Sequence, residues 1–202
     1  MNKALQTIMI IATTVFLCAG CGEDAGISQK NLEPYEALIC ATDAEVVEAM
    51  GEGVAQDYPD TENQLESPVM WQREYKGCLF ADGSAENQGK TVVRYYLPDL
   101  EDVISGAAKD DPRKVSCVIM SAALSTEDSV SLYEEVMKTL GDPTSEEAPF
   151  DKAQQYSSFW NGEKCAYQFW YTPPDNDGEQ CGVVFAISDM EYYSNEESAE
   201  FQ

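Results

Sequence analysis

The chain has 202 residues, of which 44% are hydrophobic and 10% aromatic, and this is enough apolar material for one sizeable core or two small fused ones. Its formal net charge of -25 comes from 37 acidic and 12 basic residues. Because nucleic acids and anionic lipid headgroups are bound through Lys and Arg, this balance excludes nucleic acid as a partner. It leaves open attraction of cations or of a basic partner, or simply a well-solvated surface.

The sequence contains no histidine. Ser-His and Cys-His nucleophile pairs, the imidazole general base and the commonest zinc ligand are therefore absent. Paired carboxylates carry no information here, because with 37 acids some pair always looks close. We predict that the protein is not an enzyme, has no catalytic residues, and holds no cofactor and no metal. A histidine-free hydrolase is the least favoured alternative.

The first 21 residues, 1–21, differ from the rest of the chain. Lys3 is their only charge, and an apolar run of about 14 residues follows it. A spanning helix needs roughly 20 apolar residues, so this run is too short to cross a membrane. A short positive start, an apolar run and small residues at the exit are typical of a secretory signal. The mature protein is therefore predicted to leave the cytoplasm.

The signal closes on Leu17-Cys18-Ala19-Gly20-Cys21. This resembles the lipobox of bacterial lipoproteins, in which a leucine-small-small-cysteine box is cleaved before the cysteine that becomes lipidated. It departs from that pattern because Cys18 stands where leucine is usual. The resemblance implies an acyl chain such as palmitate on Cys21, and a protein anchored to the cell membrane by this lipid alone, facing away from the cytoplasm. An ordinary cleaved signal is the alternative.

The rest of the chain divides into four predicted segments. Residues 22–39 are polar at their start and are predicted to be a tether. Residues 190–202 form an acidic tail that is predicted to fray. The two segments between them, 40–124 and 125–189, are each predicted to fold as a helix followed by strands.

Two stretches, 45–52 and 135–142, match in their apolar positions and end in a glycine followed by an acid. Both patterns predict the end of an amphipathic helix. Thr42-Asp43-Ala44-Glu45 is a capping box that predicts the start of the first helix. The similarity of the two stretches indicates a duplicated unit.

Alternating apolar residues and turn signals predict three strands after each helix, with Asn161-Gly162 as a strong hairpin signal. The predicted strands are 69–75, 91–97 and 115–124 in the first segment, and 154–160, 164–172 and 182–188 in the second. The fold class predicted is α+β: two tandem repeats of one helix followed by three antiparallel strands, with the helices on one sheet face.

Alternation also predicts which side chains face the core. The inward sets are Val93, Tyr95 and Leu97; Val118, Met120 and Ala122; Tyr167, Phe169 and Tyr171; and Val183, Phe185 and Ile187. This leaves Trp170, Tyr96, Arg94 and Phe159 on the outer face, and Trp, Tyr and Arg dominate protein-binding hot spots. The alternative is that this face is covered by the other unit or by the segment 29–40.

The element order and the motif Leu140-Gly141-Asp142-Pro143 resemble the β-lactamase-inhibitor-protein-like fold over roughly 40–189. That fold is shared by small outer-membrane lipoproteins of the assembly machinery. The resemblance implies binding of another protein through the open sheet face. The function predicted is therefore an exported, lipid-anchored module that binds an envelope or extracellular protein. Binding of a small ligand or a divalent cation between the units is the alternative.

Five cysteines follow the lipobox: Cys40, Cys78, Cys117, Cys165 and Cys181. In an exported protein, two disulfides and one odd thiol are the default expectation. Cys165 and Cys181 are too far apart along the predicted hairpin to pair with each other. Small buried thiols are the alternative for Cys117 and Cys181. The acidic stretch 175–179 fits a hairpin turn better than a calcium loop.

Overall fold

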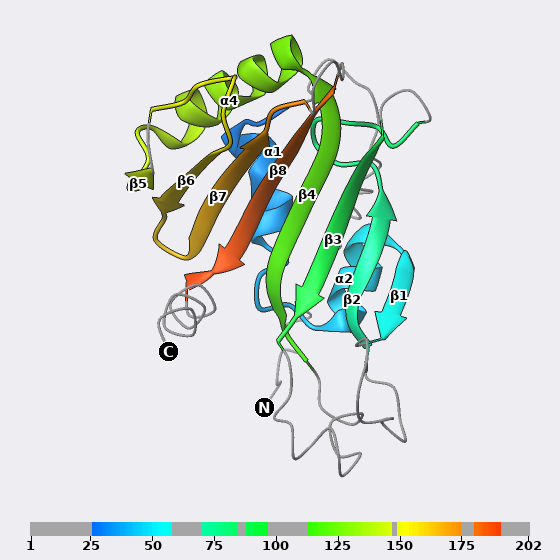
Figure 1. Ribbon diagram of the computed structural model, residues 1–202. Helices are drawn as coiled ribbons and strands as arrows, with labels where there is room; N and C mark the ends of the chain where they lie inside the picture. The colour runs from blue at the N-terminus through cyan, green and yellow to red at the C-terminus, as the bar shows by residue number, and fades with distance from the viewer. Residues whose placement is uncertain are drawn as a thin grey trace, which may run out of the picture.

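The protein folds around one antiparallel sheet of eight strands, in the order β1-β2-β3-β4-β8-β7-β6-β5 (Figure 1). The computed structural model describes residues 26–57, 70–84, 88–96, 113–146, 149–174 and 180–190. The strands are β1 Val54–Asp57, β2 Met70–Lys76, β3 Gly89–Tyr95, β4 Val115–Ser125, β5 Ser145–Glu146, β6 Tyr156–Asn161, β7 Cys165–Thr172 and β8 Gln180–Asp189. The helices within these ranges are α1 Gln29–Glu36, α2 Asp43–Met50 and α4 Thr126–Leu140.

The predicted fold class, two repeats of a helix and three strands in 40–124 and 125–189, is wrong. Both segments contribute to a single sheet, because β4 pairs with β8 along most of its length. The helices α2 and α4 are each followed by a short extra strand, β1 after α2 and β5 after α4. These two strands form the outer edges of the sheet. Pairing the long strands β4 and β8 removes two exposed edges that would otherwise invite aggregation. The resemblance to the β-lactamase-inhibitor-protein-like fold was based on two separate repeats of a helix and three strands. A single eight-stranded sheet gives that resemblance no support.

The predicted tether is wrong where the structure describes it, from residue 26 onward. This part contains α1 and buries Ile27, Leu32, Tyr35 and Leu38 in the core. Its N-terminal end is fixed to α4, because the backbone N–H of Ile27 donates to Glu135 Oε2 at 3.0 Å. Four buried apolar side chains among polar residues gave too weak a periodicity to predict a helix.

The predicted helix ends are confirmed. Thr42 and Glu45 form the capping box that begins α2. Gly51 and Gly141 follow the two matching helices with φ values of +85° and +81°. A residue with a Cβ rarely adopts such a conformation, which explains why glycine stands at both places.

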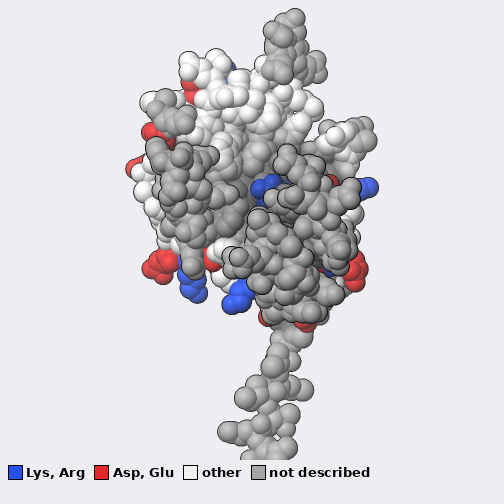
Figure 2. All heavy atoms as spheres, turned by 60° about the horizontal axis from the view of Figure 1, so that its bottom comes forward, with Lys and Arg blue, Asp and Glu red and all other residues white. Residues whose placement is uncertain are grey.

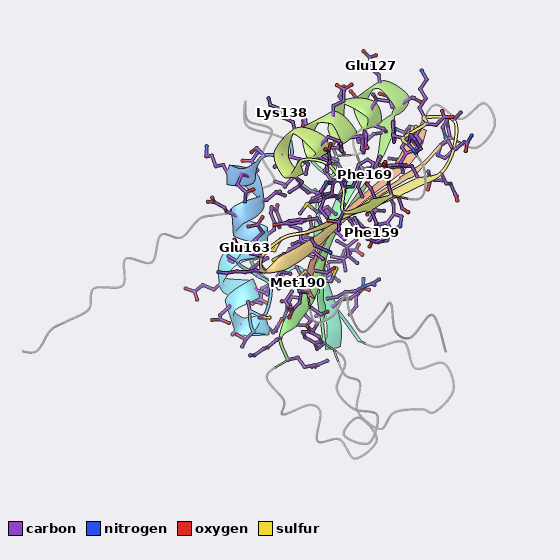
Figure 3. All side chains as sticks on the ribbon, turned by 90° about the vertical axis from the view of Figure 1, so that its left-hand side faces the viewer. Glu127, Lys138, Phe159, Glu163, Phe169 and Met190 are labelled. Carbon is purple, nitrogen blue, oxygen red and sulfur yellow. The ribbon has the colours of Figure 1, made fainter. Side chains whose placement is uncertain are left out.

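The three described helices pack on one face of the sheet, and the hydrophobic core lies between them and the strands (Figure 3). The predicted inward sets are confirmed where they are described: the largest fully buried side chains include Val93, Val118, Met120, Phe169, Tyr171, Val183, Phe185 and Ile187. Tyr167 is only half-buried. Leu97 lies outside the described residues. Strand alternation therefore predicted the two faces of the sheet correctly although the fold class was wrong.

Candidate functional site

The candidate site is the sheet face opposite the helices, called here the open face. Its middle row crosses five strands as a chain of cross-strand partners: Val92, Ile119, Ala186, Gln168 and Phe159. Four of these five side chains are apolar, although no described helix packs on this face (Figure 3). Val92 and Ala186 are buried, at 6% and 3% exposure, and the other three side chains are half-buried, so the exposed apolar part of this face is confined to its neighbouring row.

Trp170 on β7 lies in the next row, with Ser157 and Val184 as its cross-strand partners. Its side chain is 38% exposed, and Val54 is the only other exposed large hydrophobic residue in the described part of the chain. Its indole meets the ring of Phe159 edge-on, with ring centroids 6.3 Å apart. Figure 3 shows Phe159 on the side of the sheet away from α4, whereas Phe169 points toward α4. The predicted outward orientation of Trp170 and Phe159 is confirmed.

Arg94 and Tyr96 do not join this aromatic pair. Arg94 on β3 is the cross-strand partner of Cys117, and its Nε donates to Gln72 Oε1 at 3.4 Å. Strands β3 and β7 are separated by β4 and β8, which places them about 14 Å apart at a spacing of about 4.8 Å per strand. The hydroxyl of Tyr96 donates to Asp189 Oδ2 at 2.7 Å, at the far end of β8. The four predicted binding residues therefore form two separate groups.

The aliphatic part of the open face was missing from the predicted site. Val92, Ile119 and Val184 point outward beside Arg94 and Trp170, by the same alternation that placed those two residues. The sequence carried a different signal, because apolar residues on both faces of β3, β4 and β8 are typical of strands that are covered on both sides, and the outward Val92 and Ala186 are buried. Attention to aromatic and charged residues alone overlooked it.

A second feature is a cavity of about 400 Å³ between α1 and the start of β7. Its charged lining residues are Glu33, Glu36, Glu163 and Lys164, and Cys165 and Tyr167 also line it. The hydroxyl of Tyr167 donates to Glu36 Oε1 at 2.8 Å, and this acceptor and burial raise the pKa of that hydroxyl, burial most of all. No group of three or more metal-ligating side chains occurs in the described part of the chain. The cavity is acidic, but it is not a preformed metal centre.

The surface at the lower end of the sheet carries charges of both signs. Figure 2 shows Lys and Arg as well as Asp and Glu in this view. Asp189 is the last residue of β8, at this end of the sheet, and it accepts hydrogen bonds from the hydroxyl of Tyr96 and from the thiol of Cys40. The excess of acids in the sequence is thus interrupted here by cationic side chains.

None of the five cysteines that the structure describes takes part in a disulfide, so the default of two disulfides is not observed. Cys117 and Cys181 are buried, as the alternative predicted. Cys165 opens β7, whereas Cys181 lies near the other end of the β7–β8 hairpin, which agrees with the predicted separation. The acidic stretch 175–179 lies outside the described residues.

Several other predicted features also lie outside the described residues: the signal 1–21, the lipidation site Cys21, and the tail from residue 191 onward. Within the described ranges, no helix is long and apolar enough to cross a membrane. No family model, no curated protein and no solved structure matches the chain. The lipoprotein signal therefore stays a prediction, and the function must be argued from the geometry of the sheet.

Proposed function

We propose that the protein is an exported, lipid-anchored binding module of the cell envelope that docks another protein on its open sheet face. The observation that supports this most is Trp170, a large aromatic side chain 38% exposed on a face that no described helix covers. Tryptophan is the residue most enriched in binding hot spots, because one side chain can bury a large apolar area on contact. The edge contact with Phe159 holds the indole in place before a partner arrives.

The surroundings of Trp170 fit a protein surface better than a small molecule. The open face is broad and has an apolar middle, with polar and charged residues such as Lys90 and Glu74 toward the β2 and β3 side. Protein interfaces have this arrangement of an apolar centre and a polar rim. The net charge of -25 favours a partner whose rim is basic.

Arg94 and Tyr96 take part in the proposal as rim residues. A standard interface covers about 800 Å² on each partner, or roughly 30 Å across, and this reaches from the aromatic pair to β3. Trp170 and Phe159 are then the anchor, where truncation has the largest effect. Arg94 and Tyr96 contribute less, because rim contacts remain partly solvated.

Affinity capture with matched variants tests the docking face. The bait is the chain without its signal, and the source is native envelope extract. Trp170→Ala and Phe159→Ala are expected to weaken binding of the captured partner at least about tenfold, as truncation of a hot spot does. Val54→Ala is the control, since Val54 is exposed on the same face but at the outer strand β1. Equal retention of every partner by all three variants would exclude this face.

The proposed anchor has a separate test. Cys21 is expected to carry an acyl chain, so the intact mature protein should show the corresponding added mass and partition into membranes. Cys21→Ser should lose both properties while leaving capture by the soluble domain unchanged. An unmodified mature N-terminus would instead indicate an ordinary cleaved signal and a secreted protein.

The acidic cavity supports a second candidate, binding of a small cationic ligand. Glu33, Glu36 and Glu163 line it, and at about 400 Å³ it has the size of a small-molecule site. A ligand that binds only the folded state raises the melting temperature. Titration with calcium and with a panel of basic amino acids is expected to produce such a rise, and Glu33→Gln with Glu163→Gln should reduce it.

A further inference from the structure

Two cysteines lie on either side of one carboxylate at the lower end of the sheet. Cys40, in the connection between α1 and α2, is exposed, and its Sγ is 3.0 Å from Asp189 Oδ2. Asp189 ends β8 and is the cross-strand partner of Cys165, which begins β7. Cross-strand partners have Cα atoms about 4.5–5.5 Å apart and side chains on the same face. The thiol of Cys165 therefore stands beside the carboxylate that Cys40 contacts.

The electrostatics agree with this proximity. The pKa of Cys165 is raised to about 11, first by burial, and then by Glu36, Asp189 and Cys40. Cys40 is thus close enough to act on the ionisation of Cys165. Cys165 also lines the acidic cavity, which gives a small reagent a path toward this end of the sheet.

The backbone holds Cys40 firmly in this place. Its N–H donates to the carbonyl of Val115 at 2.9 Å, and the N–H of Val115 donates to the carbonyl of Ala41 at 2.8 Å. Cys40 has a φ of +66° and is the one non-glycine residue in the described ranges with a positive φ. This conformation is unfavourable for a side chain with a Cβ and is enriched at functional positions. Glycine or asparagine would fit better if the thiol had no role.

The other three described cysteines have different surroundings. Cys78 donates to the carbonyl of Ser121, Cys117 accepts from the hydroxyl of Ser188, and Cys181 contacts the hydroxyls of Thr126 and Tyr171. All three are buried. Cys78 and Cys181 lie in the hydrophobic core, as Cys165 does, and Cys117 is buried on the opposite sheet face. Cys40 alone among the five described cysteines is exposed.

We propose that Cys40 and Cys165 form a disulfide in an oxidising environment. The exposed Cys40 thiolate attacks an external disulfide such as oxidised glutathione, which forms a mixed disulfide and releases one glutathione thiolate. The thiolate of Cys165 then attacks Sγ of Cys40, and the second glutathione leaves. The two protein thiols lose two protons and two electrons, and the external disulfide is reduced to two thiols. The new bond fastens the α1–α2 connection to β7, across the end of β8.

This disulfide extends beyond the proposed function and depends on export only for the supply of an oxidant. It also assigns a role to Asp189. The negative charge of this residue disfavours a thiolate beside it, and so it slows closure of the disulfide while both thiols are reduced. The carboxylate moves aside when the two sulfur atoms come together.

Peptide mapping of the purified full chain tests the pair directly. The protein is equilibrated with oxidised and reduced glutathione, alkylated, and cleaved after glutamate without reduction. Cleavage gives the peptides 37–45 and 164–179, which contain Cys40 and Cys165 as their single cysteines, while Cys181 falls in 180–191. The expected product is 37–45 linked to 164–179, two hydrogens lighter than the two peptides together. Its formation should also raise the urea midpoint of unfolding.

Three variants serve as controls in the same assay. Cys40→Ser should abolish the linked peptide and the shift in urea midpoint, and Cys117→Ser should leave both unchanged. Asp189→Asn should form the linked peptide several-fold faster. The proposal is overturned if Cys40 and Cys165 of folded wild-type protein are both still alkylated after equilibration under oxidising conditions. It is also overturned if Cys40 is found linked to another cysteine. Because purified protein is used, neither result depends on the anchor or on partner binding.

Discussion

The two halves of the sheet are built in the same element order but are stabilised differently where their helices meet the strands. Between α2 and the strands β2 and β3, the contact is ionic: Arg73 binds the carboxylate of Asp43, and Tyr95 donates to the same carboxylate. Between α4 and the strands β6 and β7, it is aromatic: the ring centroid of Tyr133 lies 5.3 Å from that of Tyr156 and 5.4 Å from that of Phe169.

The length of the helix explains this difference. With 15 residues, α4 is long enough to lay apolar side chains over several strands, whereas α2 has eight residues and buries only Val46 completely. A short helix has little apolar area with which to bind a sheet. A charge-assisted, bidentate contact is directional and needs only one side chain from the helix. The comparison teaches that one sheet can hold a short helix through a specific pair and a long helix through packed area.

Truncating the aromatic centre should have the largest effect. Phe169 is fully buried and lies 5.4 Å from Tyr133, ring centroid to ring centroid. Phe169→Ala is expected to lower the free energy of unfolding by about 3–5 kcal/mol, because it leaves a cavity that the rigid sheet cannot close. Urea unfolding followed by tryptophan fluorescence measures this. Phe169→Leu is the matched control, and its free energy of unfolding should fall much less. An equal fall would mean that the aromatic ring itself, and not the volume it fills, is what the cluster requires.

Breaking the ionic contact should lower the free energy of unfolding by less, about 2 kcal/mol for Asp43→Ala. A fully buried pair would lose about 3–5 kcal/mol, but the Asp43 side chain is 34% exposed and solvent screens part of the interaction. In Arg73→Met combined with Asp43→Ala, no buried charge is left unpaired, so the double variant should be more stable than the sum of the two single losses predicts. Additive losses in this cycle would contradict direct coupling.

The same pair predicts a dependence on pH. The hydrogen bonds from Arg73, and then from Tyr95, lower the pKa of Asp43 in the folded state below its ordinary value of 3.8. A lowered pKa means that the unfolded state binds the proton first, so the stabilisation is complete well above pH 3.8 and declines as the pH falls through the folded value. Urea midpoints between pH 7 and pH 2 should therefore fall more steeply in wild type than in Asp43→Asn.

The comparison also indicates how much of the fold the sequence determines locally. The capping box at Thr42 and the alternation around Phe169 and Val118 predicted element types and faces correctly, because these signals depend on neighbouring residues. The pairing of β4 with β8 could not be predicted, since alternation places a side chain on a face but does not identify the next strand. The Asp43–Arg73 contact joins residues 30 positions apart and leaves no periodic signal.

The candidate site follows the same division. Alternation could assign Trp170 and Phe159 to one face, but it could not make them neighbours. A two-residue turn at Asn161-Gly162 would pair Trp160 with Glu163, whereas Trp160 pairs with Tyr167 and the turn lies at 162–165. Arg94 was assigned to the right face, but its distance from Trp170 depends on the order of strands in the whole sheet. Tyr96 follows β3 after a shift in register, and its hydroxyl reaches Asp189 at the end of β8. For the same reason, Cys40 and Cys165 could not be identified as neighbours.

Trp170 provides the sharpest contrast with both helix contacts, because its truncation should change stability least. Trp170→Ala is expected to lower the free energy of unfolding by about 1 kcal/mol, since the indole gives up one edge contact with Phe159 and part of its strand packing, and leaves no closed cavity. Urea unfolding checks this value beside that of Phe169→Ala on the same strand. A loss as large as that of Phe169 would mean that the indole serves the fold. A small loss, combined with loss of partner capture, would separate a side chain exposed for binding from one buried for stability.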